Sequence, residues 1–237
     1  MPGRAVPVLL LRVAHPRQAL LTAVGVAVAA ALAGRPGQEV LLVLGTVLVG
    51  QAVLGWHHDL VDRDRDARHD LPGKPVAQGL LDPGTVSFTI ACAVLLLVPL
   101  SVASGVEAAA AYLLSVLVGL AGNVWLRTGR LSWLPWAVGY ALYPAYLSYG
   151  GWGGTGSDTP PEAATTVVAA LLGVGVHVLR ALPGLVADHQ DGYRSLPLRI
   201  AVRTGARRLL VVTCVYVVVV LVVLLVLAHR AGPALQS

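Results

Sequence analysis

The chain has 237 residues, of which 56% are hydrophobic and 12% are charged, and its mean hydropathy is +0.74. A soluble domain has about 25% charged residues, so this composition excludes a soluble globular protein and indicates one that crosses a bilayer several times. We attribute the net charge of +5 to membrane topology and expect no nucleic-acid partner.

Apolar runs recur as far as residue 227, which excludes a signal peptide followed by a soluble body. We predict one all-α domain over residues 1–237, a transmembrane bundle of about seven spans in a cell membrane. Cys92 and Cys214 lie inside apolar runs, so we expect two core residues and neither a disulfide nor a zinc site. The predicted spans are about residues 18–33, 40–55, 85–103, 106–126, 131–149, 163–179 and 209–227.

The polar stretch over residues 56–79, after the second predicted span, is strongly acidic. Only 12 residues of the chain are Asp or Glu, and five of them lie between Asp59 and Asp70. On a helix, Asp59, Asp62, Asp66 and Asp70 fall within about 80° of one another, and Asp64 lies roughly opposite. Carboxylates stacked on one face repel each other unless a cation lies among them. Oxygen ligands of this kind suit Mg²⁺ completed by water and substrate phosphate.

The spacing alone also fits a second interpretation. The stretch can be a solvated loop between spans, in which neighbouring arginines balance the acids. These arginines are Arg63, Arg65 and Arg68.

A second polar stretch, residues 180–208, follows the sixth predicted span and contains Asp188 and Asp191, three residues apart. With the N-terminus inside, 15 of the 17 Lys and Arg residues fall in cytoplasmic segments, and only Arg35 and Arg230 fall outside. The excess of positive charge inside predicts that both acidic stretches face the cytoplasm and that Asp158 faces outside.

Aromatic residues recur along the fifth predicted span. Trp133 and Trp136 lie near its start, where we expect an interfacial belt. Tyr140 and Tyr143 lie deeper, and we predict that their rings line a cavity.

In its polar motifs the chain resembles the UbiA family of intramembrane prenyltransferases. The first family motif, Asn-Asp-x-x-Asp-x-x-x-Asp, is similar to residues 58–66, and the Lys/Arg-Pro motif that follows is similar to residues 74–79. The middle signature resembles residues 123–128 with 132–136. The second acidic motif aligns with residues 180–197, so the resemblance covers nearly the whole chain.

The resemblance implies a fold, an activity and a set of site residues. It implies a helical membrane bundle, Mg²⁺ as cofactor, a prenyl diphosphate donor and an unknown acceptor, with the lipid bilayer around them. By position, the implied metal ligands are Asp59, Asp62, Asp66, Asp188 and, as a weaker match, Asp191. The residues assigned to substrate are Lys74, Arg127, Arg180, Asn123, Tyr140 and Tyr143.

Three positions depart from the family motifs. His58 replaces an asparagine of the first motif, and Arg180 and Gly184 replace an asparagine and an aspartate of the second. Arg180, Gly184 and Asp188 share one face of an ideal helix. Only one span follows the second motif, where the family usually has more, so we expect a bundle shortened at this end.

Three functions stay open at this level. The first is transfer of an isoprenoid group to an acceptor, and the second is cyclisation of the same class of donor by an enzyme of the same family type. The third is a lipid-binding or assembly role without catalysis, suggested by Gly184 and the small number of helices after the second motif.

Overall fold

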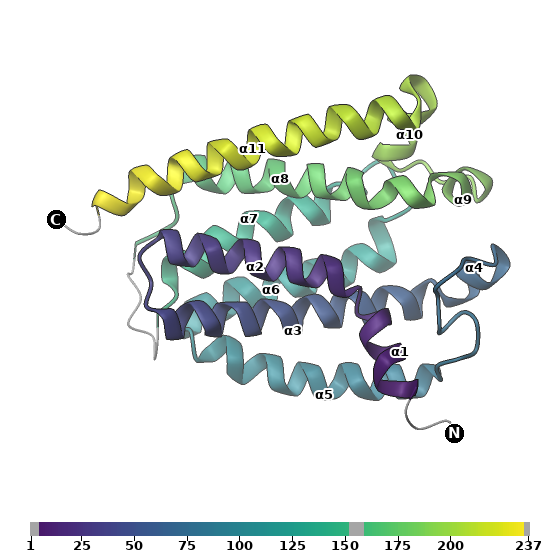
Figure 1. The fold of residues 1–237 in the computed structure, drawn as a ribbon, viewed down its shortest axis with the longest axis horizontal. Helices are drawn as coiled ribbons and strands as arrows, with labels where there is room; N and C mark the ends of the chain where they lie inside the picture. Colours follow the sequence, from purple (N-terminus) through teal and green to yellow (C-terminus); the bar gives the residue numbers. More distant parts are fainter. Residues whose placement is uncertain (1–4, 152–158, 235–237) are drawn as a thin grey trace.

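The computed structural model describes residues 5–151 and 159–234, and within these ranges the chain is helical (Figure 1). The predicted loop residue Asp158 lies outside the described residues. The helices are α1 (Ala5–Val13), α2 (Pro16–Leu32), α3 (Gly37–Val61), α4 (Arg63–Arg68), α5 (Pro83–Val102), α6 (Val106–Ala121), a π-helical turn (Gly122–Leu126), α7 (Leu134–Tyr149), α8 (Ala163–Ala181), a 3-10 turn (Leu182–Gly184), α9 (Leu185–Gln190), α10 (Leu196–Thr204) and α11 (Ala206–Ala234).

Each predicted span falls on a helix. Five helical segments are long and apolar enough to cross a membrane, namely Gly37–Val61, Pro83–Val102, Val106–Leu126, Ala163–Gln190 and Ala206–Leu227. The apolar helix α2 has 17 residues, and α7 has 16. The all-α membrane class is therefore confirmed, while seven as the number of crossings stays a prediction.

Neighbouring helices run in opposite directions and pack against one another in chain order (Figure 1). α2 packs on α3, α6 on α7, and α7 on α8, while α11 covers α8 and also touches α2. Glycine permits the closest of these approaches: a Cβ at Gly173 of α8 would lie 2.2 Å from the carbonyl oxygen of Trp136 on α7.

The outer face of the bundle is apolar, as a lipid-facing surface must be. Phe88 and Leu95 of α5 are 70% and 76% exposed, and α11 exposes a row of valines. Cys92 and Cys214 are exposed on the same two helices. Their prediction as core residues is wrong, because an apolar residue in a membrane helix can face lipid as readily as protein.

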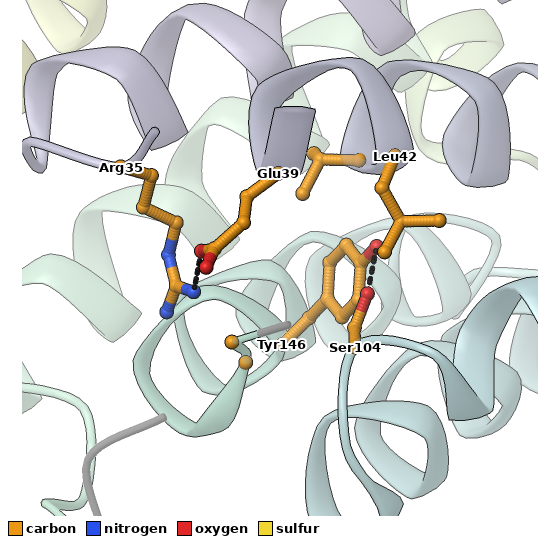
Figure 2. Close-up of a pocket in the computed structure, with 8 residues that line it drawn as sticks. Arg35, Glu39, Leu42, Ser104 and Tyr146 are labelled. Carbon is orange, nitrogen blue, oxygen red and sulfur yellow. Dashed lines mark hydrogen bonds and ion pairs between the residues drawn. The ribbon is translucent and has the colours of Figure 1, made fainter. Parts of the chain in front are cut away.

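The two ends of the bundle differ. α4, α9 and α10 lie together at one end (right in Figure 1), with both acidic stretches. At the other end, Figure 2 shows Arg35 paired with Glu39 at 2.8 Å and Ser104 beside Tyr146, with 3.4 Å between their oxygens. The cavity there has about 10 Å³, room for a single water. This cavity is therefore too small to hold a substrate.

Candidate active site

The first acidic stretch begins inside α3 and continues into α4. α3 ends at Val61, and the backbone bends at Asp62, with φ −90° and ψ −1°, before α4 begins. Asp59, Asp62 and Asp66 are each only 3% exposed. Three carboxylates are thus buried together near one end of the bundle, where a charge is costly unless it is paired.

The two remaining acids of this stretch face water. The side chain of Asp64 is 76% exposed, and its ion-pair partner is Arg63. Asp70 is exposed because α4 ends at Arg68 and Asp70 then adopts a positive φ of 46°. The prediction that Asp70 shares the buried face is therefore wrong.

Basic side chains surround the buried carboxylates. The ammonium group of Lys74 lies 2.7 Å from Asp59 Oδ1 and 3.1 Å from Asp66 Oδ2. His15, from the turn before α2, places Nε2 2.9 Å from the same oxygen of Asp59. Lys74 therefore bridges Asp59, near the end of α3, and Asp66, in α4.

Asp62 is paired from the other side of the site. Arg127, directly after the π-helical turn, forms an ion pair with Asp62 Oδ1, and His58 Nε2 lies 3.5 Å from Asp62 Oδ2. In the π-helical turn, Asn123 donates through Nδ2 to the Leu54 carbonyl at 3.3 Å. Asn123 and Arg127 are the two polar residues that the family resemblance assigns to this region. Asn123 therefore contacts α3, and Arg127 contacts Asp62 directly after it.

The second acidic stretch is joined to the first by one arginine. Arg65 donates through Nη2 to Asp188 Oδ1 at 2.7 Å and through Nε to Asp191 Oδ2 at 2.5 Å. Its guanidinium also lies 4.8 Å from the ring centre of Tyr193. His69 Nε2 is 2.8 Å from Asp191 Oδ1. The hydrogen bond from Arg65 lowers the pKa of Asp191 below its ordinary value.

Arg180 lies at the end of α8 and has a different environment. Its guanidinium lies over the ring of Trp136 at 4.8 Å, and it forms no hydrogen bond or ion pair with any described residue. It is close enough to Asp59 for the two charges to interact. A 3-10 turn follows at Leu182–Gly184, and a Cβ at Gly184 would meet only Asp188 Oδ1, at 3.9 Å. Space is therefore open beside Gly184.

The predicted cavity tyrosines take part in a packed aromatic cluster. Tyr143 is 9% exposed and accepts a hydrogen bond from Gln51 at 3.1 Å. Its ring centre is 5.4 Å from that of Tyr140 and 6.3 Å from that of Tyr112. Tyr143 therefore belongs to the hydrophobic core, while Tyr140 is only partly buried beside it.

The carboxylates suit a divalent cation in their donor chemistry. Asp62 Oδ1 and Asp66 Oδ2 are the oxygens that Arg127 and Lys74 contact, so a metal ion bound to them would replace these two cations. Within residues 5–151 and 159–234, no three His, Cys, Asp or Glu side chains converge as a metal site. A Mg²⁺ ion held here would therefore take further ligands from water and substrate, as this ion usually does.

Three contributors to the site are not predicted from sequence. Arg65 and His69 lie within the first acidic stretch, but nothing in the pattern identifies their partners more than 120 residues away. His15 precedes Pro16 and has no motif around it. The only available signal is that Arg65 stands between two aspartates of the motif.

Comparison with known proteins identifies a family for most of the chain. Residues 19–235 match the model of the UbiA prenyltransferase family. No curated protein matches the sequence.

Solved structures show the same fold. A UbiA homolog from Archaeoglobus fulgidus bound to GPP and Mg²⁺ superposes with a TM-score of 0.68 at 16% identity, over 95% of this chain and 84% of that one. The same homolog bound to DMAPP and Mg²⁺ gives 0.67 at 17% identity, over 95% and 83%. A digeranylgeranylglyceryl phosphate synthase gives 0.61 at 15% identity, over 96% and 86%. At such identities the likeness is one of fold.

Proposed function

The chain belongs to the UbiA prenyltransferase family, and from this premise we propose that it is a Mg²⁺-dependent intramembrane prenyltransferase. It moves an isoprenoid group from a prenyl diphosphate to an acceptor. The observation that carries the proposal is the burial of Asp59, Asp62 and Asp66, each 3% exposed, at the end of the bundle that also holds Asp188. Three buried acids close together serve a function, because stability alone disfavours them.

In this proposal Asp59, Asp62, Asp66 and Asp188 hold Mg²⁺, and Asp191 is a further ligand. The bound cation supplies positive charge to the diphosphate that departs. Mg²⁺ bound to Asp62 and Asp66 would displace Arg127 and Lys74 from the same oxygens, which leaves both cations available to the diphosphate.

The basic residues of the site bind the donor. Lys74 and Arg127 already lie against the buried carboxylates, so both can donate to diphosphate oxygens in the same place. The allylic C–O bond breaks with its electron pair on the leaving diphosphate, and an acceptor atom then bonds to that carbon and loses a proton. In this proposal the prenyl chain lies along Tyr140, which is only partly buried, while Tyr143 supports that ring from the core and Asn123 holds the π-helical turn against α3.

The test uses purified protein, a panel of prenyl diphosphates and Mg²⁺, with pyrophosphate release as the measurement. Asp59→Asn should abolish release, whereas Asp64→Asn, which changes an exposed acid of the same stretch, should leave it unchanged. Equal loss in both variants, or none in either, would contradict the assignment.

A non-catalytic role in lipid binding is the second candidate. It is favoured by one observation: Arg65 and His69 already pair with both acids of the second stretch. Donor that binds without pyrophosphate release, with or without acceptor, would support this role. Release without any acceptor, with a cyclic product, would instead indicate a cyclase.

We place both acidic stretches on the cytoplasmic side of a cell membrane, following the distribution of Lys and Arg. In a variant with both native cysteines replaced by serine, an impermeant thiol reagent applied to intact cells should label Gln38→Cys and not Asp64→Cys. Both positions are exposed: Gln38 lies at the start of α3, and Asp64 lies in α4, beyond the other end of α3. The reverse pattern would invert the proposed orientation.

Arg180 has a specific role in this proposal: it donates to the donor diphosphate in place of part of a second metal. It has no carboxylate partner among the described residues, and it lies near Asp59. A guanidinium can hold a phosphate through two parallel hydrogen bonds. The space beside Gly184 leaves room for the diphosphate.

The test measures binding of a non-hydrolysable donor analogue across a Mg²⁺ titration. Arg180→Ala should weaken binding about tenfold or more, and the double change Arg180→Asn with Gly184→Asp should restore binding with a steeper dependence on Mg²⁺. Arg68→Ala removes an exposed cation nearby and serves as the control. If Arg180→Ala binds the analogue as well as wild type does, Arg180 is not a phosphate ligand.

A further inference from the structure

A cleft of about 310 Å³ opens beside the second acidic stretch. This volume lies at the lower end of the range for small-molecule sites. One wall comes from Arg130 in the loop that precedes α7, and the other from the end of α9, the segment that joins α9 to α10, and α10 itself. Four of the lining residues are arginines: Arg130, Arg194, Arg199 and Arg203.

These four guanidinium groups have no acid to balance them. All four side chains are exposed, and none forms an ion pair or a side-chain hydrogen bond with the part of the chain that the structure describes. The nearby Asp191 is already held by Arg65 and His69. Four cations around one hollow repel each other, and an anion in the cleft would relieve that repulsion.

Hydrogen bonds hold the two walls together. The backbone N–H of Arg194 donates to the carbonyl of Thr128 at 2.7 Å, and that of Leu196 donates to Ser132 Oγ at 3.1 Å. Ser132 is 2% exposed and also contacts His177 Nε2 at 3.0 Å. The cleft is therefore a built feature of the fold, made where two loops are fixed to each other.

The cleft lies where α10 meets a membrane-length helix. α10 is followed by Gly205, with a φ of +86°, and then by α11. Val202, which lines the cleft, is 66% exposed, and Leu131, next to Arg130, is 51% exposed. Apolar and cationic groups thus border the same hollow. Such a mixture is typical of helices that lie at a bilayer surface.

We propose that this cleft binds the phosphate headgroup of an anionic membrane lipid. Guanidinium groups hold phosphate oxygens bidentately, and the exposed Val202 and Leu131 would contact the acyl chains of the same molecule. The proposal does not depend on the proposed donor site, because none of the four arginines is assigned there to the metal or to the donor.

General attraction of positive charge to the membrane does not require this arrangement. Arg207 and Arg208, at the start of α11, are exposed at the same interface but do not line the cleft. They provide a matched control, because their removal changes the net charge by the same amount as removal of Arg199 and Arg203.

The experiment counts lipids bound to the full chain in detergent by native mass spectrometry, at constant ionic strength. The probes are phosphatidylglycerol, phosphatidylcholine with the same acyl chains, and sodium phosphate. Wild type should prefer phosphatidylglycerol, and the R199Q/R203Q variant should lose about tenfold in that affinity. The R207Q/R208Q variant should stay within about twofold of wild type, because charges away from the ligand are screened.

Neither double variant removes an ion pair or a side-chain hydrogen bond within the described chain, so both should fold, which a thermal melt checks. R199K/R203K, which keeps the charge but not the bidentate geometry, should fall between wild type and R199Q/R203Q. Equal losses in the two Gln variants would mean diffuse attraction and overturn the site. Displacement of phosphatidylglycerol by an equal concentration of sodium phosphate would assign the cleft to a soluble anion and overturn the lipid.

Discussion

Replacement of Lys74 by methionine tests how the buried acids are balanced. Lys74 is the only described partner of Asp66 and one of two described partners of Asp59. Methionine keeps most of the length and the apolar stem but removes the charge. Asp66, which is only 3% exposed, would then have no cation beside it among the described residues.

The expected cost is about 3 kcal/mol, the lower end of the range for loss of one partner from a buried pair. The lower end applies because the Lys74 side chain is 20% exposed and His15 still contacts Asp59. For a chain of this size, about 3 kcal/mol corresponds to a fall in Tm of about 6–12 °C.

Thermal melts of the purified protein, with and without Mg²⁺, provide the assay. If Mg²⁺ binds these carboxylates, it should raise the Tm of Lys74→Met more than that of wild type, because the cation no longer competes with the ammonium group. Arg63→Met is the matched control: it breaks the exposed pair with Asp64 and should cost at most about 1 kcal/mol.

Lys74→Arg retains the charge and should retain most of the stability. The reasoning would be refuted if Lys74→Met melts with wild type and Mg²⁺ shifts both proteins equally. In that case neither the lysine nor a metal would be balancing the buried acids.

Two further predictions concern other parts of the molecule. Because Arg65 lowers the pKa of Asp191, this pair adds stability above the ordinary carboxyl pKa and loses it as the pH falls through the lowered value. Melts at a series of pH values should therefore show Asp191→Asn less stable than wild type from pH 5 to 8, with the gap closing below about pH 4; a constant gap would contradict this. Gly50→Ala should cost about 1–3 kcal/mol, because its Cβ would lie 2.1 Å from the hydroxyl oxygen of Tyr112. Gly45→Ala meets nothing within 4 Å and should not destabilise α3, as denaturation of both variants can establish.

The sequence alone was sufficient for the class of protein and the places of the helices. Long apolar runs determine where helices cross a bilayer, because every backbone polar group in lipid must be paired within the chain. The spacing of Asp59, Asp62 and Asp66 predicts that they share one helical face, and the structure buries all three.

The same local reasoning fails for Asp70. The helix is interrupted at Asp62 and ends at Arg68, so the angles of an ideal helix no longer describe where the Asp70 side chain lies. The burial of Cys92 and Cys214 was also misjudged. In an apolar helix the sequence pattern does not show whether a residue faces lipid or faces protein, since both environments are apolar.

Only the tertiary structure decided how the charges are paired. Arg65 lies among the acids of its own stretch, yet its partners are Asp188 and Asp191 on the far side of the site. His15 reaches Asp59 in the same way, from a turn that no motif marks. Many pairings of 17 basic and 12 acidic residues satisfy the sequence equally well. The fold selects one of them because it brings α4 and α9 to the same end of the bundle, and a buried charge must pair with the opposite charge within reach.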